Sequence, residues 1–349
     1  MKKNITLILI SITLIISGCG GGGGGSSSAN VQSTVIDNFN MTQGTADTKL
    51  GSTYIQEFLT SQGSSTSVST MYSRIDLDGL SDAHSSGWTG KGKTISVVDT
   101  DSFGTATGHG RLVSDIARMT APGASRNEYV LSTALSDSAT NISTMASDVI
   151  TTSAGYTPSS VASDGSLESY LNSFVSSLES SDALITVAAQ HSNWSGTRTD
   201  GSTSLTGRGG FSTCSNTETM TIATCNTWSV TDDLDSDNVI YVGEVDSNDE
   251  IPFWSNQAGS EHKNQFIVTS SDYITLASDG EPDGNSLAAP RVAGAGALVR
   301  QKFPNLTGAQ TATVILHTAD DLGVSGVDDV FGHGKLNVGK ALSPVGNLH

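Results

Sequence analysis

Positively charged residues are scarce in this sequence. Its 349 residues contain 17 Lys and Arg against 35 Asp and Glu, which gives a formal net charge of −18. A protein that binds nucleic acid needs clustered cations to neutralise phosphates. We therefore expect no nucleic-acid partner, and we interpret the acidic balance as typical of a soluble, exported protein.

Long apolar runs are also scarce. Residues 5–16 form an apolar stretch that is shorter than an ordinary transmembrane helix and follows a basic start, MKK. It ends in ISGC, in which small residues precede Cys19. This pattern resembles a bacterial lipobox, in which the cysteine is lipidated and becomes the mature N-terminus; a plain signal peptide is the alternative. We expect residues 1–18 to be a lipoprotein signal peptide and Cys19 to carry acyl chains such as palmitate.

The segment after Cys19 has little hydrophobic periodicity. Residues 20–28 contain only Gly and Ser, a composition that behaves as a flexible tether. Residues 29–70 are polar, and we expect an N-terminal arm with one helical turn at residues 54–58. The domain prediction is therefore a lipidated tether and arm over residues 19–70 and a folded domain over residues 71–345. Gly rather than Asp after Cys19 favours a lipid-anchored place in the bacterial cell envelope, at the outer membrane.

Cysteine is rare as well, with three in the chain. Apart from Cys19 there are Cys214 and Cys225, which are not part of a C-x-x-C pair, so a cysteine metal site is not expected. Export implies an oxidising compartment, where these two residues can close a small loop as a disulfide. We expect this disulfide.

One acidic cluster has the spacing of a calcium loop. Its members occupy positions 1, 3, 5 and 12 of an EF-hand-like register, and they are Asp233, Asp235, Asp237 and Glu244. The glycine expected at position 6 is replaced by Asn238, and the residues that follow have the pattern of a buried strand. We therefore favour a solvated acidic turn and assign no metal ligands.

Apolar segments with two different periodicities alternate along the rest of the chain. Strands are expected at residues 94–98, 129–133, 147–152, 183–189, 239–245 and 266–269. Helices are expected at residues 75–83, 110–119, 167–178 and 288–303. Continuous apolar strands that alternate with helices predict an α/β fold with a mostly parallel sheet covered on both faces.

Three short segments contribute an acid, a histidine and a serine in that order. Residues 94–101, TISVVDTD, place Asp99 at the C-terminal end of a strand, where open α/β sheets carry their sites. His109 begins a helix within GHG, and Ser286 begins another within GNSLAAP. A serine nucleophile needs a base within reach, which histidine can supply, and a carboxylate fixes the tautomer of that histidine. The set predicts nucleophilic catalysis.

These segments resemble the three motifs of the subtilase family of serine peptidases. An esterase or lipase of the α/β-hydrolase type would have the order Ser, acid, His and a G-x-S-x-G motif, which this sequence lacks. Further similar blocks are WTGKGK at 88–93, APGA at 121–124, SAG at 153–155, VIYVGEVD at 239–246 and FGHGKLN at 331–337. The resemblance covers about residues 70–345 and implies a subtilisin-like, doubly wound, mostly parallel sheet with helices on both faces.

The resemblance also implies the roles of individual residues. Ser286 would attack the scissile carbonyl, His109 would act as base and then as acid, and Asp99 would orient His109 in a serine endopeptidase. The substrate-binding edge strand of the family corresponds to Ser153, Ala154 and Gly155. We expect a polypeptide substrate, a monomeric chain and no required cofactor. Subtilases often bind Ca²⁺ in loops, so Ca²⁺ binding stays an alternative for which we name no ligand residues.

Residues 187–193, VAAQHSN, depart from the family pattern. Subtilases usually have Ala-Ala-Gly-Asn here, and the Asn side chain donates to the oxyanion. Gln190 aligns with that Gly and His191 with that Asn, so we expect His191 to donate together with Ser286, with Gln190 or Asn193 as alternatives. Losing a donor costs about 2.7–4 kcal/mol of transition-state stabilisation. The competing hypothesis is a catalytically weak or inactive binding or adaptor lipoprotein with a subtilase fold.

Overall fold

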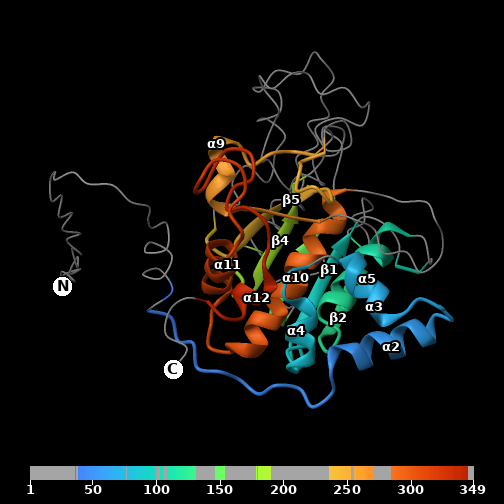
Figure 1. Ribbon diagram of the computed structural model, residues 1–349. Helices are drawn as coiled ribbons and strands as arrows, with labels where there is room; N and C mark the ends of the chain where they lie inside the picture. The colour runs from blue at the N-terminus through green and yellow to red at the C-terminus, as the bar shows by residue number, and fades with distance from the viewer. Residues whose placement is uncertain are drawn as a thin grey trace, which may run out of the picture.

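A parallel six-stranded sheet forms the centre of the computed structural model, in the order β2-β1-β3-β4-β5-β6 (Figure 1). The strands are β1 Thr94–Asp99, β2 Ser125–Val130, β3 Val149–Thr152, β4 Leu184–Ala188, β5 Val239–Val245 and β6 Phe266–Ser270. The structure describes residues 36, 38–75, 77–99, 103–104, 108–130, 146–153, 178, 180–189, 236–252, 255–270 and 284–344.

Both faces of the sheet are buried, because successive residues of each central strand enter two different hydrophobic cores. In β4, Leu184 belongs to the larger core, and its neighbour Ile185 belongs to a smaller core on the opposite face. A strand buried on both faces needs apolar side chains throughout, which explains the unbroken apolar runs in the sequence. The predicted α/β class and mostly parallel sheet are confirmed.

The described helices are α2 Gly51–Ser61, α3 Val68–Ile75, α4 Leu80–Ser85, α5 His109–Thr120, α9 Gly259–His262, α10 Asn285–Lys302, α11 Gly308–His317 and α12 Val338–Ala341, with a 3₁₀ turn, η2, at Lys263–Gln265. The most central is α10, which is buried along most of its length and packs on α5, β3, β4 and β5 (Figure 1). Its small residues allow this close packing: a Cβ atom on Gly296 would lie 2.3 Å from Leu184 Cδ2.

The helix predicted at residues 75–83 is wrong, because the chain breaks there into α3 and α4. Between them, Asp78 forms a bridge with Asn337, and Gly79 adopts φ 77°. A Cβ atom on Gly79 would lie 2.5 Å from the backbone of Gly339. A contact with the C-terminal part of the chain therefore interrupts a locally plausible helix.

Two other predicted segments have different bounds in the structure. The single turn expected at residues 54–58 is part of α2, which buries Ile55, Phe58 and Leu59 against the main core. The strand expected at residues 129–133 is β2, which starts at Ser125 because it pairs in register with β1 from Thr94 onward. β2 is an edge strand with mostly exposed or half-buried residues, so its start has no apolar pattern.

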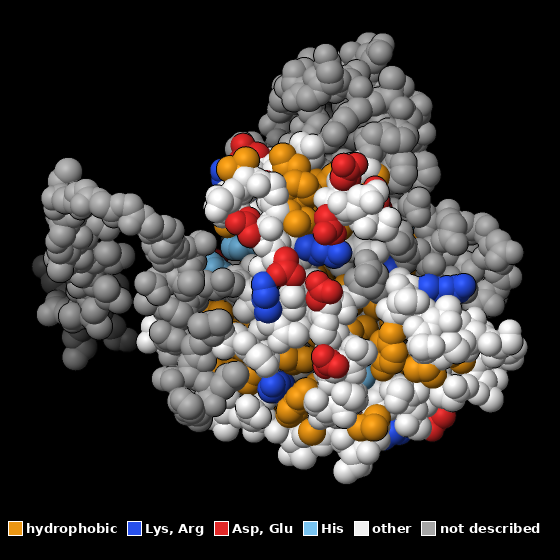
Figure 2. All heavy atoms as spheres, in the orientation of Figure 1, with side chains coloured by type: hydrophobic (Ala, Val, Ile, Leu, Met, Phe, Trp, Pro, Cys, Tyr) orange, Lys and Arg blue, Asp and Glu red, His pale blue; other side chains and the backbone are white. Residues whose placement is uncertain are grey.

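On the visible face, Asp and Glu side chains are spread among a smaller number of Lys and Arg side chains (Figure 2). Among the residues that the structure describes, no helix has the length and apolar character to cross a bilayer.

Candidate functional site

Asp99 and His109 meet where the strand order of the sheet reverses. β2 and β3 flank β1, so the carboxyl end of β1 is the switch point at which doubly wound sheets form their sites. Asp99 is the last residue of β1 and is 1% exposed, and His109 is the first residue of α5. His109 Nδ1 lies 2.8 Å from Asp99 Oδ2.

This contact determines the tautomer of His109. An ionised carboxylate only accepts hydrogen bonds, so Nδ1 carries the proton and donates to Asp99. In the neutral ring, Nε2 is then left with a lone pair. The imidazole side chain is 39% exposed, whereas the Asp99 side chain is 1% exposed. The ring is therefore held by Asp99 at Nδ1 and is partly exposed to solvent.

Ser286 is the second residue of α10 and is half-buried. The residue that caps this helix is Gly284, at φ 153° and ψ 154°, a conformation that is essentially restricted to glycine. The first backbone N–H groups of a helix have no partner within the helix, so they are available to an anionic group there. Ser286 thus lies next to a set of potential oxyanion donors.

α10 runs antiparallel to the sheet, with its start at the edge where Asp99 lies. Ser153, directly after β3, donates through Oγ to the carbonyl of Ser286 at 2.9 Å. At the far end of the helix, Arg300 Nη1 donates to the carbonyl of Asp148, just before β3. α5, which begins with His109, packs against α10, which carries Ser286. Both helices therefore start at the carboxyl edge of the sheet.

Two adjacent buried residues that our sequence reasoning missed contact the start of α10 and the residue after β4, respectively. Ser255 Oγ donates to Asn285 Oδ1 at 2.9 Å, and Asn256 Nδ2 donates to the carbonyl of Ala189 at 2.6 Å. Ala189 directly precedes residues 190–193, the segment with the unusual oxyanion sequence. Ser255 and Asn256 follow no recognisable motif, so only the long-range contacts identify them.

Several predicted site residues lie outside the described part of the chain and remain predictions. They are Cys19, Ala154, Gly155, Gln190, His191, Asn193, Cys214 and Cys225.

The acidic cluster considered as a calcium loop does not have a loop conformation at its last position. Glu244 is fully buried within β5, the strand that we predicted there, while Asp233 and Asp235 are outside the described residues. Within the described ranges, no group of three or more His, Cys, Asp or Glu side chains is placed to hold a metal ion.

Comparison with known proteins identifies a family. The model of the subtilase family matches residues 103–334, about two thirds of the 349-residue chain. The matched region includes His109 and Ser286 and begins just after Asp99.

Individual relatives match over short stretches. An extracellular serine protease of Serratia marcescens is 44% identical over 18% of this chain and 6% of its own length. The autotransporter lipoprotein NalP of Neisseria meningitidis is 45% identical over 17% of this chain and 6% of its own length. Among solved structures, a lanthipeptide protease aligns with 72% of this chain and 87% of its own at 17% identity, with a TM-score of 0.49. The matched stretch is thus a small part of either curated relative.

Proposed function

Because the chain belongs to the subtilase family, we propose that it is a serine endopeptidase that uses Ser286, His109 and Asp99 as its catalytic triad. The observation that carries this proposal is the 2.8 Å contact between His109 Nδ1 and the buried carboxylate of Asp99. Such a contact leaves Nε2 able to take the proton of a serine hydroxyl. The alternation of histidine as base and then as acid requires this arrangement.

In the proposed reaction, Ser286 Oγ attacks the carbonyl carbon of the scissile bond while His109 Nε2 accepts the hydroxyl proton. The resulting imidazolium is stabilised by Asp99, which stays ionised. His109 then gives the proton to the leaving amine, and an acyl-enzyme remains on Ser286. Water hydrolyses this intermediate with His109 again as the base. The chemistry needs only these three side chains and hydrogen-bond donors for the oxyanion, so we propose no cofactor.

The oxyanion would form next to the start of α10. The backbone N–H of Ser286 supports this, because it belongs to the first turn of the helix. The second donor would come from residues 190–193, with His191 as our first choice and Gln190 or Asn193 as alternatives. Asn256 holds Ala189, the residue directly before this segment, by donating to its carbonyl at 2.6 Å.

The polypeptide substrate would lie extended beside the end of β3, where Ser153 is followed by Ala154 and Gly155. Backbone hydrogen bonds of the strand-addition type would hold it there. We keep a monomer as the expected state, because one chain contains all three proposed catalytic residues.

A fluorophosphonate probe tests the assignment, because it reacts only with an activated serine. We expect labelling of the wild type, none of Ser286→Ala and strongly reduced labelling of His109→Ala. Ser86→Ala is a matched control, since Ser86 is exposed and follows α4. Labelling that persists in Ser286→Ala would contradict the proposal.

A second candidate function is a catalytically silent binding or adaptor protein. The replacement of the usual Gly-Asn by Gln190 and His191 favours it, because a missing oxyanion donor slows acyl transfer. Casein hydrolysis separates the two: the peptidase proposal expects a wild-type rate above the Ser286→Ala background, and the adaptor proposal expects equal rates.

We also propose export to the cell envelope and a lipid anchor at Cys19. The lipobox-like ISGC and the likeness to a lipoprotein of Neisseria meningitidis support this. Cells that express the chain should incorporate labelled palmitate into the wild type and not into Cys19→Ala. Incorporation into both would locate the acyl chain elsewhere.

A further inference from the structure

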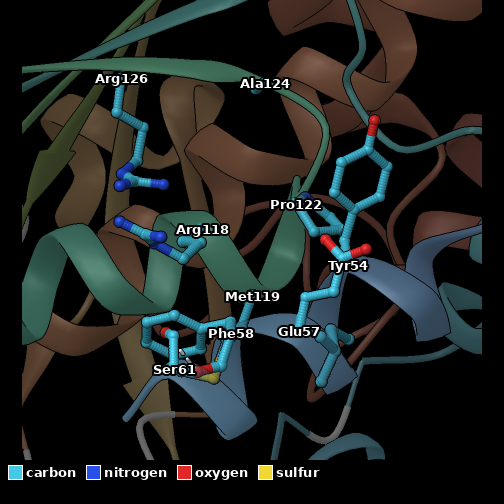
Figure 3. A pocket seen from close by; sticks show the side chains of 10 residues that line it. Tyr54, Glu57, Phe58, Ser61, Arg118, Met119, Pro122, Ala124 and Arg126 are labelled. Carbon is cyan, nitrogen blue, oxygen red and sulfur yellow. Dashed lines mark hydrogen bonds between the residues drawn. The ribbon is translucent and has the colours of Figure 1, made fainter. Parts of the chain in front are cut away.

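A pocket of about 370 Å³ lies at the end of α5 remote from His109, between α2, the last turns of α5 and β2 (Figure 3). The residues that line it are Tyr54, Ile55, Glu57, Phe58, Ser61, Arg118, Met119, Pro122, Ala124 and Arg126. Its volume is within the range of small-molecule sites. The triad and its neighbours do not contribute to it.

One side of this pocket is cationic. Arg118 from α5 and Arg126 from β2 direct their guanidinium groups to the same side of the pocket (Figure 3). Two neighbouring arginines are notable in a chain of net charge −18. Burial and, to a smaller extent, the charge of Arg118 lower the pKa of Arg126 from 12.5 to about 10.

Two carboxylates, Asp115 and Glu128, lie near enough to attract both arginines, but each also has another partner. Glu128 accepts from the hydroxyl of Ser114, which in turn accepts from Arg126 Nε at 3.2 Å. Asp115 accepts from Arg111 Nε at 2.8 Å and stays 3.8 Å from Arg118 Nε. Arg118 Nε is buried and has no hydrogen-bond partner among the described residues. On the opposite side of the pocket, Glu57 pairs with Lys49.

The remainder of the pocket is largely apolar. Phe58 lies under the guanidinium of Arg118, with 4.7 Å between Arg118 Cζ and the ring centre. Met119 and Pro122 line the pocket beside them. Paired guanidinium groups match the two oxygens of a carboxylate, and apolar walls favour a hydrophobic body attached to it.

We infer that this pocket binds a small organic carboxylate with an apolar or aromatic body, held by Arg118 and Arg126. The free C-terminus of a peptide that ends in a hydrophobic residue has this chemistry. The inference is independent of the proposed peptidase activity, because none of the proposed catalytic residues contributes to the pocket.

Isothermal titration calorimetry of the full chain with N-acetyl-L-phenylalanine tests the inference. We expect saturable binding, with at least 10-fold weaker binding of the neutral amide, N-acetyl-L-phenylalaninamide. Acetate and inorganic phosphate test the apolar body and should also bind at least 10-fold more weakly. Equal affinity for the amide would overturn the role of the arginines, and equal affinity for phosphate or acetate would overturn the role of the apolar walls.

Variants locate the binding site. Arg126→Gln and Arg118→Gln should each weaken binding at least 10-fold, because each removes a charge-assisted pair. Lys263→Gln removes the same charge from η2 and should leave the affinity unchanged. Wild-type affinity in both arginine variants would refute the site. Prior reaction with the fluorophosphonate should not alter the affinity; loss of binding there would assign the acid to the Ser286 region instead.

A measurement on the wild type avoids any dependence on variant folding. With ¹³C-methyl methionine, the signal of Met119 should shift when N-acetyl-L-phenylalanine is added, because Met119 lines the pocket. Met71, buried in α3 outside the pocket lining, provides the internal reference. An unchanged Met119 signal at saturating acid would refute the site.

Discussion

The hydroxyl of Ser153 donates to the backbone carbonyl of Ser286 at 2.9 Å. In a regular helix this carbonyl would accept from the N–H of residue 290, four positions later. Residue 290 is Pro290, which lies inside α10 and has no N–H. Ser153 therefore supplies the hydrogen bond that the proline removes, and in doing so it fixes the proposed nucleophile to the end of β3.

Ser153→Ala should destabilise the fold by about 1–2 kcal/mol and lower kcat, because it leaves a partly buried carbonyl at the start of α10 without a donor. Chemical denaturation and peptide hydrolysis measure the two effects. Pro290→Ala returns an N–H to the helix, so Ser153→Ala should cost less in that background. A cost that is the same in both backgrounds would show that the two residues do not share this carbonyl.

Asp99→Asn should reduce kcat by on the order of 10⁴-fold with little change in fold, the magnitude known for the same substitution in a related triad. An amide in place of the carboxylate can donate to His109 Nδ1, which favours the tautomer whose Nε2 carries the proton and cannot act as a base. The rate of fluorophosphonate labelling reports the loss directly. Asp82→Asn, at an exposed position of α4, is the control. A labelling rate within 10-fold of wild type would remove Asp99 from the role.

Gly284→Ala should abolish most activity, because the φ of 153° before Ser286 is strained for any residue with a Cβ atom. We expect about 1–3 kcal/mol of destabilisation or a displaced Ser286. Gly92→Ala provides a comparison, since Gly92 also has a positive φ of 76° but open space around it. That variant should lose some stability and keep its activity per folded molecule. Full activity in Gly284→Ala would show that the cap does not position the serine.

The sequence predicts most of the sheet because each buried parallel strand appears in it as a continuous run of apolar residues. The expected bounds of β5 match the structure, and those of β4 differ by one residue at each end. α10 was equally recognisable, since its residues are small or apolar nearly throughout. An element that is buried on all sides needs small or apolar residues throughout, and the sequence alone shows such a pattern.

What the sequence could not predict depends on contacts between distant segments. The break at Gly79 is caused by the backbone of Gly339, and nothing near residue 79 in the sequence encodes that neighbour. The same holds for Asn256, which is buried against the carbonyl of Ala189. The arginine pocket combines residues of α2, α5 and β2, and no spacing rule connects Tyr54 with Arg126.

His84 makes the stability of the protein depend on pH. It is fully buried, with Nε2 3.0 Å from the carbonyl of Thr120 and Nδ1 2.9 Å from the hydroxyl of Tyr72. A carbonyl only accepts, so Nε2–H donates to Thr120 and Nδ1 accepts from Tyr72, which is the neutral ring. Burial lowers the pKa of His84 from 6.5 to about 4.

Between about pH 4 and 6.5 the unfolded chain therefore binds a proton at His84 that the folded chain does not. Stability from this residue is complete above pH 6.5 and falls as the pH drops toward 4, by about 3 kcal/mol at most.

His84→Gln should lower the free energy of unfolding at pH 7 yet flatten its decline with acid, as measured by denaturant titrations from pH 4 to 8. Tyr72→Phe keeps the imidazole and should retain the wild-type slope. His333, whose pKa burial also lowers to about 4, leaves a residual slope in every variant, so the difference between His84→Gln and wild type is the informative quantity. Parallel curves for these two proteins would mean that His84 does not change its protonation on unfolding in this range.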